Sequence, residues 1–253
     1  MVDIHSHILP GIDDGAQSID ESVAMLKLAA ASGTTDIVAT PHANSYFSFD
    51  EQTVEKLVAQ LSAQTSGLIK IHVGCDFHLN FDNLSDAFKN PVKYTVNNGR
   101  YLLVELPDLA SLPVMRTALS RLLAVQMVPV ITHPERNGPL CANLRELEDW
   151  VRDGCLLQIT AQSFFGRFGP VAQRVSETLM NSDMVHFVAS DAHDSLDRPP
   201  DLSAAYQLIT EHWGSDRANA LCIDYPTAVI MNEAIFAAAP KPVKRSSRFS
   251  FWK

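Results

Sequence analysis

Short apolar runs alternate with amphipathic segments along most of the chain. Seven runs of four to six residues, rich in Val, Ile and Leu, have the length and composition of buried strands. They fall at residues 2–5, 35–40, 68–73, 101–104, 128–132, 155–159 and 184–189. Strands that are apolar throughout, rather than alternating, are typical of a parallel sheet covered on both faces.

Between these runs, apolar residues recur every three or four positions, as on one face of a helix. In residues 18–32, Ser18 and Glu21 form a capping-box pattern and Gly33 marks the end of the helix. Further helices are expected at residues 50–66, 113–126, 144–152, 171–180, 202–212, 215–221 and 226–238, with one short helix within the polar stretch 81–99. Strands that alternate with helices predict an α/β protein.

Histidines and carboxylates directly follow six of the predicted strands. An open doubly wound sheet gathers its ligands mainly at one switch point, whereas a closed barrel brings every carboxyl strand end around one mouth. Six contributing strands therefore favour a (β/α) barrel, or a nearly closed one. The residues concerned are His5, His7, His42, Asp76, Glu105, His133, Asp191 and His193.

The chemistry of these positions indicates a metal centre. Together with Asp14 from the first loop, they comprise five histidines and four carboxylates, without a cysteine. Imidazole and carboxylate ligands suit Mn, Fe or Zn, whereas a site for a softer metal would recruit thiolates. One ion cannot use nine protein ligands and stay open to substrate, so two or three divalent ions are expected.

Composition is that of an ordinary globular protein. The chain has 253 residues, 46% of them hydrophobic, and its mean hydropathy is zero. The start lacks the basic segment of an export signal, and the four cysteines show no CxxC spacing, so we expect reduced thiols and a cytoplasmic location. The net charge of −9 argues against nucleic-acid binding.

The end of the chain differs in charge from the rest. Residues 241–253 contain five basic and no acidic residues, which leaves −14 for residues 1–240. We expect one catalytic domain over residues 1–240 and a disordered tail over residues 241–253. Basic residues beside aromatic ones suit weak contact with an anionic membrane surface, or with an acidic protein such as another copy of this chain in a homo-oligomer.

Six segments resemble the polymerase-and-histidinol-phosphatase (PHP) superfamily, and more closely its bacterial tyrosine-protein phosphatases encoded with capsule and exopolysaccharide genes, the CpsB/YwqE type. They are HSH at 5–7, DDG at 13–15, ATPH at 39–42, LVELP at 103–107, HPER at 133–136 and SDAH at 190–193. The resemblance covers about residues 1–235. It implies a distorted seven-stranded (β/α) barrel of TIM-like form with three divalent ions, usually Mn²⁺.

The resemblance also implies a role for each of these residues. One metal would be held by His5, His7, Asp76 and Asp191, a second by Asp76, Glu105 and His133, and a third by Asp14, His42 and His193. Arg136 and Arg198 match the family's phosphate-binding arginines.

One residue departs from the family pattern. The family usually has Glu where this chain has Asp76, whose side chain is one methylene shorter. We therefore expect the strand end to move inward or a metal to be held less tightly. His78, two residues further on, either compensates for the shorter ligand or is a satisfied histidine with no part in the site.

Together these features predict a metal-dependent phosphotyrosine-protein phosphatase, in which metal-bound hydroxide attacks phosphorus and the two arginines hold the phosphate oxygens. Its expected substrate is a bacterial tyrosine kinase that controls capsule or exopolysaccharide synthesis. Two alternatives stay open: a small-molecule phosphoesterase of the histidinol-phosphatase kind, and a catalytically weak regulatory partner of a polysaccharide-assembly kinase. Cysteine-phosphatase chemistry is excluded, because none of the four cysteines is followed six positions later by arginine.

Overall fold

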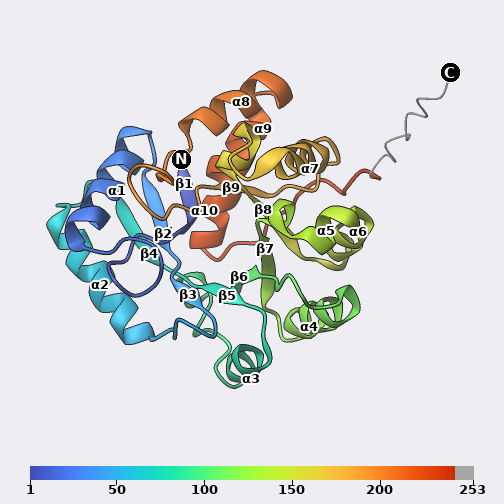
Figure 1. Cartoon of the computed structure of the whole chain (residues 1–253), viewed down its shortest axis with the longest axis horizontal. Helices are drawn as coiled ribbons and strands as arrows, with labels where there is room; N and C mark the ends of the chain where they lie inside the picture. Colours follow the sequence, from blue (N-terminus) through green and yellow to red (C-terminus); the bar gives the residue numbers. More distant parts are fainter. Residues whose placement is uncertain (243–253) are drawn as a thin grey trace.

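A computed structural model describes residues 1–242 and shows strands in the middle of the molecule with helices around them (Figure 1). The strands are β1 (Val2–Ser6), β2 (Asp36–Ala39), β3 (His42–Ala43), β4 (Lys70–Val73), β5 (Asp76–His78), β6 (Tyr101–Glu105), β7 (Val128–Thr132), β8 (Leu156–Thr160) and β9 (Phe187–Ala189). Neighbouring strands pair in parallel throughout this part of the chain, which confirms the predicted parallel α/β architecture.

The strands form two sheets that continue into one another. One has the order β1-β2-β4 and the other the order β3-β5-β6-β7-β8-β9. The Gly74 N–H donates to the Ala39 carbonyl at 3.0 Å, and the Asp76 N–H donates to the Pro41 carbonyl at 3.1 Å. β3 therefore continues the line of β2, and β5 that of β4, so the nine strands occupy the seven predicted positions. We did not predict the two short continuations.

The barrel closes between its first and last strands. A parallel bridge joins Ser6 to Ala192, and the backbone N–H of His7 donates to the Ala192 carbonyl at 2.8 Å. Deeper in the structure, the buried Asp3 carboxylate accepts hydrogen bonds from the N–H of Ser190 at 3.0 Å and from its hydroxyl at 2.5 Å. These contacts complete the barrel that the strand-end residues predicted.

Asp3→Ala should lower the free energy of unfolding by about 1–3 kcal/mol, because it leaves the buried Ser190 N–H without its acceptor and the Ser190 hydroxyl with only the more distant His5 carbonyl, at 3.3 Å. The exposed Glu55 on α2 provides the control, since Glu55→Ala should change stability by less than about 0.5 kcal/mol. Urea unfolding of both variants measures the difference. Equal stability of the two variants would show that Asp3 does not hold β1 to β9.

Residues 1–242 form ten α-helices. They are α1 (Ile19–Ala31), α2 (Glu51–Gln64), α3 (Phe81–Lys89), α4 (Leu112–Ala124), α5 (Gly138–Ala142), α6 (Leu144–Asp153), α7 (Gly169–Asn181), α8 (Ser203–Trp213), α9 (Ser215–Asn219) and α10 (Tyr225–Ile230). The sequence predicted all of them except α5. None of the helices in this part of the chain is both long and apolar enough to cross a membrane.

Two local predictions were wrong. The helix expected over residues 226–238 ends at Ile230, because Asn232 takes a left-handed backbone with a φ of 56° and its side chain accepts a hydrogen bond from the Arg100 N–H. At α1, the Ser18 hydroxyl caps the helix as expected. The Glu21 carboxylate instead accepts from the Ser195 N–H at 2.7 Å, so it ties α1 to the loop after β9.

Apolar side chains from several strands together fill the interior of the barrel. Ile4, Leu103 and Phe187, from β1, β6 and β9, are fully buried in one apolar cluster, which Val229 of α10 joins. Most of the predicted basic tail, residues 243–253, lies outside the described residues. At its start, the Lys241 N–H donates to the Ser182 carbonyl at 2.8 Å.

Candidate active site

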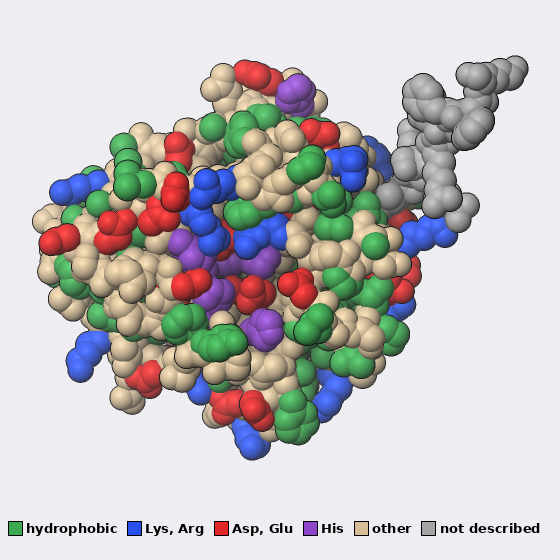
Figure 2. All heavy atoms as spheres, viewed as in Figure 1, with side chains coloured by type: hydrophobic (Ala, Val, Ile, Leu, Met, Phe, Trp, Pro, Cys, Tyr) green, Lys and Arg blue, Asp and Glu red, His purple; other side chains and the backbone are tan. Residues whose placement is uncertain are grey.

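The polar residues predicted at the strand ends meet on one face of the barrel. Figure 2 shows histidine side chains gathered at the centre of this face, with carboxylates and basic side chains beside them. Two of these residues lie within short strands that we did not predict: His42 opens β3 and Asp76 opens β5. The two strands pair at these residues, so the sheet itself holds the imidazole and the carboxylate side by side.

β1 and the residue that follows it supply two histidines, His5 and His7, whose imidazoles lie close together. The pairing of β1 with β2 shifts between Asp3 and Ser6, and an irregularity of this kind redirects the side chains that follow it. The Nε2 atoms of His5 and His7 lie 3.3 Å apart. Both rings are buried, so these nitrogens point into the polar centre and not into solvent.

Two further residues orient these imidazoles, and the sequence analysis missed both. Gln158 Oε1 lies 2.9 Å from His5 Nδ1, and Asp13 Oδ2 lies 2.8 Å from His7 Nδ1. Each contact occupies Nδ1 and leaves Nε2 able to bind a metal. Carboxylates and amides commonly orient metal-binding histidines in this way. A signal existed for each: Gln158 is a polar residue inside an apolar strand, and Asp13 belongs to the DDG segment.

Asp13→Ala should weaken Mn²⁺ binding about ten- to a hundredfold, because His7 loses the partner that fixes its ring. Calorimetric titration with Mn²⁺ measures this. Asp20→Ala, an exposed position at the start of α1, should bind Mn²⁺ like the unmodified protein. Unchanged affinity in both variants would mean that Asp13 does not position a ligand.

Gly15 explains why the DDG segment ends in glycine. A Cβ atom at this position would lie 2.1 Å from the His7 carbonyl oxygen and 2.5 Å from the His7 Cβ. These atoms belong to the His7 backbone and to the first carbon of its side chain, which cannot rotate away. A side chain at position 15 could therefore be accommodated only if His7 itself moved. The first loop can therefore pack against β1 and deliver Asp13 and Asp14 only with glycine here.

Within residues 1–242, three groups of possible ligand atoms lie close enough together to share an ion, with all atoms of a group within 4.8 Å of one another. They are His7, Asp14, His42 and His193; His5, His7 and Asp76; and His42, Asp76 and Glu105. The first contains the trio expected for the third metal, with His7 added. Neighbouring groups share a residue, so the centre is one continuous cluster.

Asp191 and His133, the two remaining expected ligands, are not members of these groups but lie close to them. Asp191 Oδ1 lies 3.6 Å from His5 Nε2 and 3.5 Å from His7 Nε2, and His133 Nε2 lies 4.0 Å from Glu105 Oε1. Asp191 and His133 both have left-handed backbones, with φ values of 50° and 35°. Such conformations in residues other than glycine cluster at functional sites.

Unsatisfied buried atoms indicate that the cluster fits divalent cations. Among residues 1–242, His42 Nδ1 and Asp76 Oδ2 are buried without a hydrogen-bond partner, although they lie 3.0 Å apart. Both are atoms that bind metals directly. The imidazole and carboxylate donors around them are those that Mn, Fe and Zn prefer.

The carboxylates draw positive charge to this centre. Burial opposes charge on every group, yet the nearby carboxylates of Asp14 and Asp76 raise the pKa of His42 to about 11, and Asp13 raises the pKa of His7 to about 9. The pKa values of Asp76 and Asp191 are held well below the usual range by the neighbouring histidines, against the effect of burial. Divalent cations would supply the positive charge that this arrangement favours.

Two other histidines, His133 and His193, have pKa values that are lowered and not raised. Burial and the positive charge of Arg136 lower the pKa of His133 to about 4, and burial with the charge on His7 lowers the pKa of His193 to about 3. Both imidazoles are therefore neutral at physiological pH. Neutral imidazole is the form that binds a metal.

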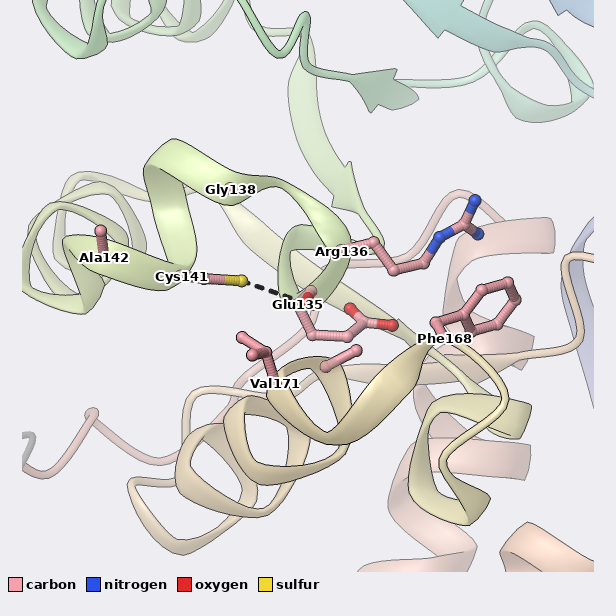
Figure 3. A pocket seen from close by; sticks show the side chains of 8 residues that line it. Glu135, Arg136, Gly138, Cys141, Ala142, Phe168 and Val171 are labelled. Atoms are coloured by element: carbon pink, nitrogen blue, oxygen red, sulfur yellow. Dashed lines mark hydrogen bonds between the residues drawn. The ribbon is translucent and has the colours of Figure 1, made fainter.

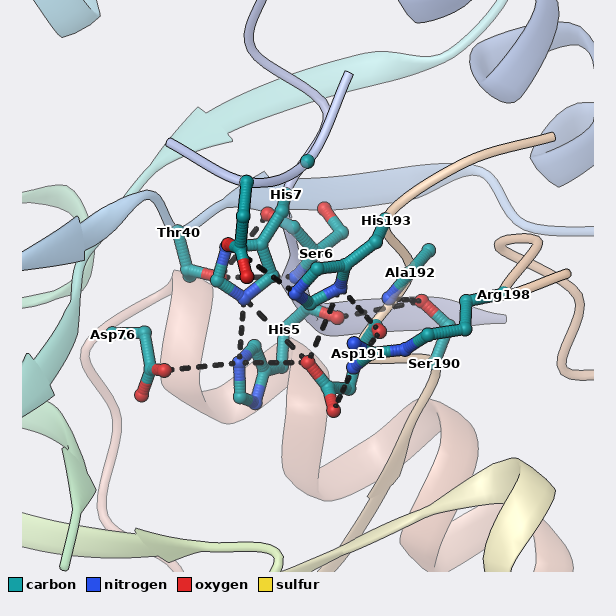
Figure 4. A network of polar contacts seen from close by, with 12 residues as sticks. His5, Ser6, His7, Thr40, Asp76, Ser190, Asp191, Ala192, His193 and Arg198 are labelled. Atoms are coloured by element: carbon teal, nitrogen blue, oxygen red, sulfur yellow. Dashed lines mark hydrogen bonds and ion pairs between the residues drawn. The ribbon is translucent and has the colours of Figure 1, made fainter. Parts of the chain in front are cut away.

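Two arginines converge on Asp191 from different loops (Figure 4 labels Arg198 and Asp191). Arg136 Nη1 pairs with Asp191 Oδ2, and Arg198 Nη2 lies 2.6 Å from the same oxygen. The Phe168 ring lies below both guanidinium groups, 4.2 Å from Arg136 Cζ and 5.7 Å from Arg198 Cζ. Arg198 Nε is buried and has no hydrogen-bond partner within the described chain.

Asp76 takes part in two ligand groups despite its short side chain. It is fully buried, and its Oδ2 lies 3.0 Å from His42 Nδ1 and 3.7 Å from His5 Nε2. His78, by contrast, faces Glu105, with Nδ1 3.2 Å from Oε2. The structure thus places His78 beside Glu105, an expected ligand that it can hold in place, and does not group it with Asp76.

Known proteins share both the sequence and the fold. A sequence model of the family described as "Capsular polysaccharide synthesis, CpsB/CapC" matches residues 1–231. Tyrosine-protein phosphatase YwqE from Bacillus subtilis is 33% identical over 263 aligned residues, covering 100% of each chain. Tyrosine-protein phosphatase CpsB from Streptococcus pneumoniae is 31% identical over 244, covering 93% of this chain and 100% of CpsB.

Solved structures give the same picture. A chain from the crystal structures of YwqE and CpsB, described as metal-dependent tyrosine phosphatases, superposes with a TM-score of 0.90 at 30% identity, covering 97% of this chain and 100% of that one. Histidinol phosphate phosphatase from Lactococcus lactis shares the fold, with a TM-score of 0.52 at 14% identity over 87% of this chain and 95% of the other. The predicted PHP-type barrel is therefore confirmed.

Proposed function

The chain belongs to the CpsB/CapC family and is a metal-dependent tyrosine-protein phosphatase linked to capsule synthesis, and we propose that the cluster at the barrel mouth is its catalytic centre. One observation carries this proposal: three overlapping groups of histidines and carboxylates lie beside two arginines that meet at Asp191. Metal ligands and phosphate-binding donors at one site are what hydrolysis of a phosphoester requires.

We propose that three divalent ions bind here, with Mn²⁺ as the first assignment and Fe or Zn as alternatives that the same donors accept. The residues that would hold them are His5, His7, Asp14, His42, Asp76, Glu105, His133, Asp191 and His193. When bound, such ions lower the pKa of coordinated water, so that hydroxide is available near neutral pH.

Arg136 and Arg198 would bind the phosphate group of the substrate. Each guanidinium presents a planar set of donors that matches two phosphate oxygens, which a lysine cannot copy. Asp191 and the Phe168 ring fix their positions before substrate arrives. Donors that are already in place at the developing charge stabilise a transition state without the cost of reorganisation.

The rim of the mouth supports a protein substrate. Tyr46, Leu109 and Leu196 lie on the loops that follow β3, β6 and β9, and their exposed fractions are 88%, 100% and 89%. Large apolar residues gathered around a polar site favour contact with another macromolecule over enclosure of a small polar ligand. We propose that a phosphotyrosyl protein binds here, in the cytoplasm, and that it is a bacterial tyrosine kinase that controls capsule or exopolysaccharide synthesis.

The basic tail has a separate proposed role. Its five basic residues suit a weak, salt-sensitive contact with an anionic membrane surface or an acidic protein, including a second copy of this chain. Such a contact would keep the phosphatase near a membrane-bound kinase.

A comparison of substrates tests the proposed function. With Mn²⁺ present, kcat/KM for a phosphotyrosyl peptide should exceed that for histidinol phosphate by roughly a hundredfold or more. A preference for histidinol phosphate would instead identify a small-molecule phosphatase. No turnover of either substrate by the Mn²⁺-loaded protein would favour the catalytically weak regulatory partner.

A further inference from the structure

A second cavity, which we call the α5–α7 pocket, lies beside Arg136 (Figure 3). Its volume is about 560 Å³, and it lies between the HPER turn with α5 on one side and the start of α7 on the other. Its lining combines apolar side chains, among them Phe168, Val171 and Ala172, with two charged residues, Glu135 and Arg136. Its walls are thus mainly apolar, unlike those of the metal-ligand cluster.

Arg136 connects the pocket to the catalytic cluster. It also lines a smaller cavity of about 170 Å³ on which Glu105 and His133 open. Its Nη1 contacts Asp191 at the cluster, while its Cζ lies 4.2 Å over the Phe168 ring at the pocket. A substrate whose phosphate meets Arg136 therefore has the α5–α7 pocket directly beside its phosphorylated residue.

A large apolar side chain in the lining of this pocket is exposed to solvent. Val171, which lines the pocket at the start of α7, is 48% exposed. The positive charge of Arg136 is already paired with Asp191 and stacked on Phe168. The Glu135 carboxylate is buried and accepts hydrogen bonds from the Ser163 hydroxyl and the Thr160 N–H, so the pocket offers mainly hydrophobic contact. Apolar surface next to a catalytic site suits an apolar group of the substrate.

We propose that the α5–α7 pocket binds an apolar side chain close to the phosphotyrosine in the substrate chain. This inference rests on the proposed phosphotyrosyl-protein substrate. An extended chain advances about 3.3–3.6 Å per residue, so side chains within about three residues of the phosphotyrosine can reach a pocket that shares Arg136 with the site. An aliphatic or aromatic side chain gains from burial there, whereas an acidic one would lose hydration without finding a partner.

Peptides and two matched variants test the proposal. The substrates are phosphotyrosyl peptides of Gly and Ser with a single Leu placed at each nearby position in turn, the same peptide without Leu, and p-nitrophenyl phosphate. Val171→Asp alters the pocket, and Val125→Asp is the control. Val125 is equally exposed, at 47%, but follows α4 at the opposite end of the barrel.

We expect the unmodified protein to prefer Leu at one position by about tenfold in kcat/KM. Val171→Asp should remove that preference, mainly through a higher KM, and should leave p-nitrophenyl phosphate and the peptide without Leu unchanged. Val125→Asp should behave like the unmodified protein with every substrate. If Val171→Asp does not fold, as judged by circular dichroism, Ala142→Asp on the facing wall should give the same result.

Several outcomes would overturn the inference. One is the absence of any preference for Leu in the unmodified protein, and another is a preference that survives both Val171→Asp and Ala142→Asp. An equal loss with peptide and p-nitrophenyl phosphate would place the effect in the catalytic centre. Failure of the proposed function looks different: p-nitrophenyl phosphate would be hydrolysed and no phosphotyrosyl peptide would be, which removes the inference as well.

Discussion

Asp76→Ala should reduce kcat/KM for a phosphotyrosyl peptide by roughly a thousandfold. Asp76 Oδ2 is buried, belongs to two of the three ligand groups, and has no hydrogen-bond partner among the described residues. Its loss would take a ligand from two groups and leave neighbouring cations without the carboxylate that separates their charges. Steady-state kinetics together with metal analysis by mass spectrometry measures both effects.

Asp76→Glu is the matched variant. It restores the longer carboxylate that is usual in the family, so we expect it to retain activity and to bind Mn²⁺ at least as tightly. Thr132 Oγ1, 3.5 Å from Asp76 Oδ1, is one of the neighbours of the longer side chain. Full metal content and full activity in Asp76→Ala would show that Asp76 is not a ligand.

Arg136→Ala and Arg198→Ala should each cost about 2–4 kcal/mol in transition-state stabilisation, measured as kcat/KM, while metal content stays unchanged. Both guanidinium groups reach Asp191, and the buried Nε of Arg198 has no hydrogen-bond partner among residues 1–242. Lysine variants should recover little activity, because an ammonium group keeps the charge near Asp191 but lacks the planar pair of donors.

Arg167→Ala provides the control for these arginines. Its side chain is partly exposed and pairs only loosely with Asp197, at 3.9 Å, so its removal should leave the rate unchanged. Unmodified rates for Arg136→Ala and Arg198→Ala would mean that they are ion-pair partners and not phosphate ligands. A loss of metal in parallel with activity would instead show that they serve to hold Asp191.

Much of the fold and most of the candidate cluster could be predicted because both depend on local patterns. Seven apolar runs located the strands, and a barrel places the residue after each strand at the same mouth. The continuations β3 and β5 were missed because Pro41 and Gly74 look like the ends of strands, and only pairing across the sheet continues them. The end of α10 depends on the contact between Asn232 and Arg100, which are distant in sequence.

The contacts of Gln158 and Glu21 could not be predicted for the same reason, because each joins residues that are distant in sequence. Gln158 and His5 are 153 positions apart in the chain, and they meet only because closure of the barrel places β8 and β1 on either side of β9. Glu21 fitted a local capping pattern, but its carboxylate holds Ser195. The period and composition of a segment indicate its secondary structure. They do not indicate which polar side chain will face the centre once the barrel has closed.

Metal removal followed by controlled return of Mn²⁺ is the decisive measurement. The protein is treated with a chelator, shown to be metal-free by mass spectrometry, and assayed on a phosphotyrosyl peptide as Mn²⁺ is added. We expect no hydrolysis at the start and full activity once the cluster of His5, His7, Asp76 and their neighbours has bound its ions. Full activity in the verified metal-free protein would contradict a metal-dependent phosphatase centred on this site.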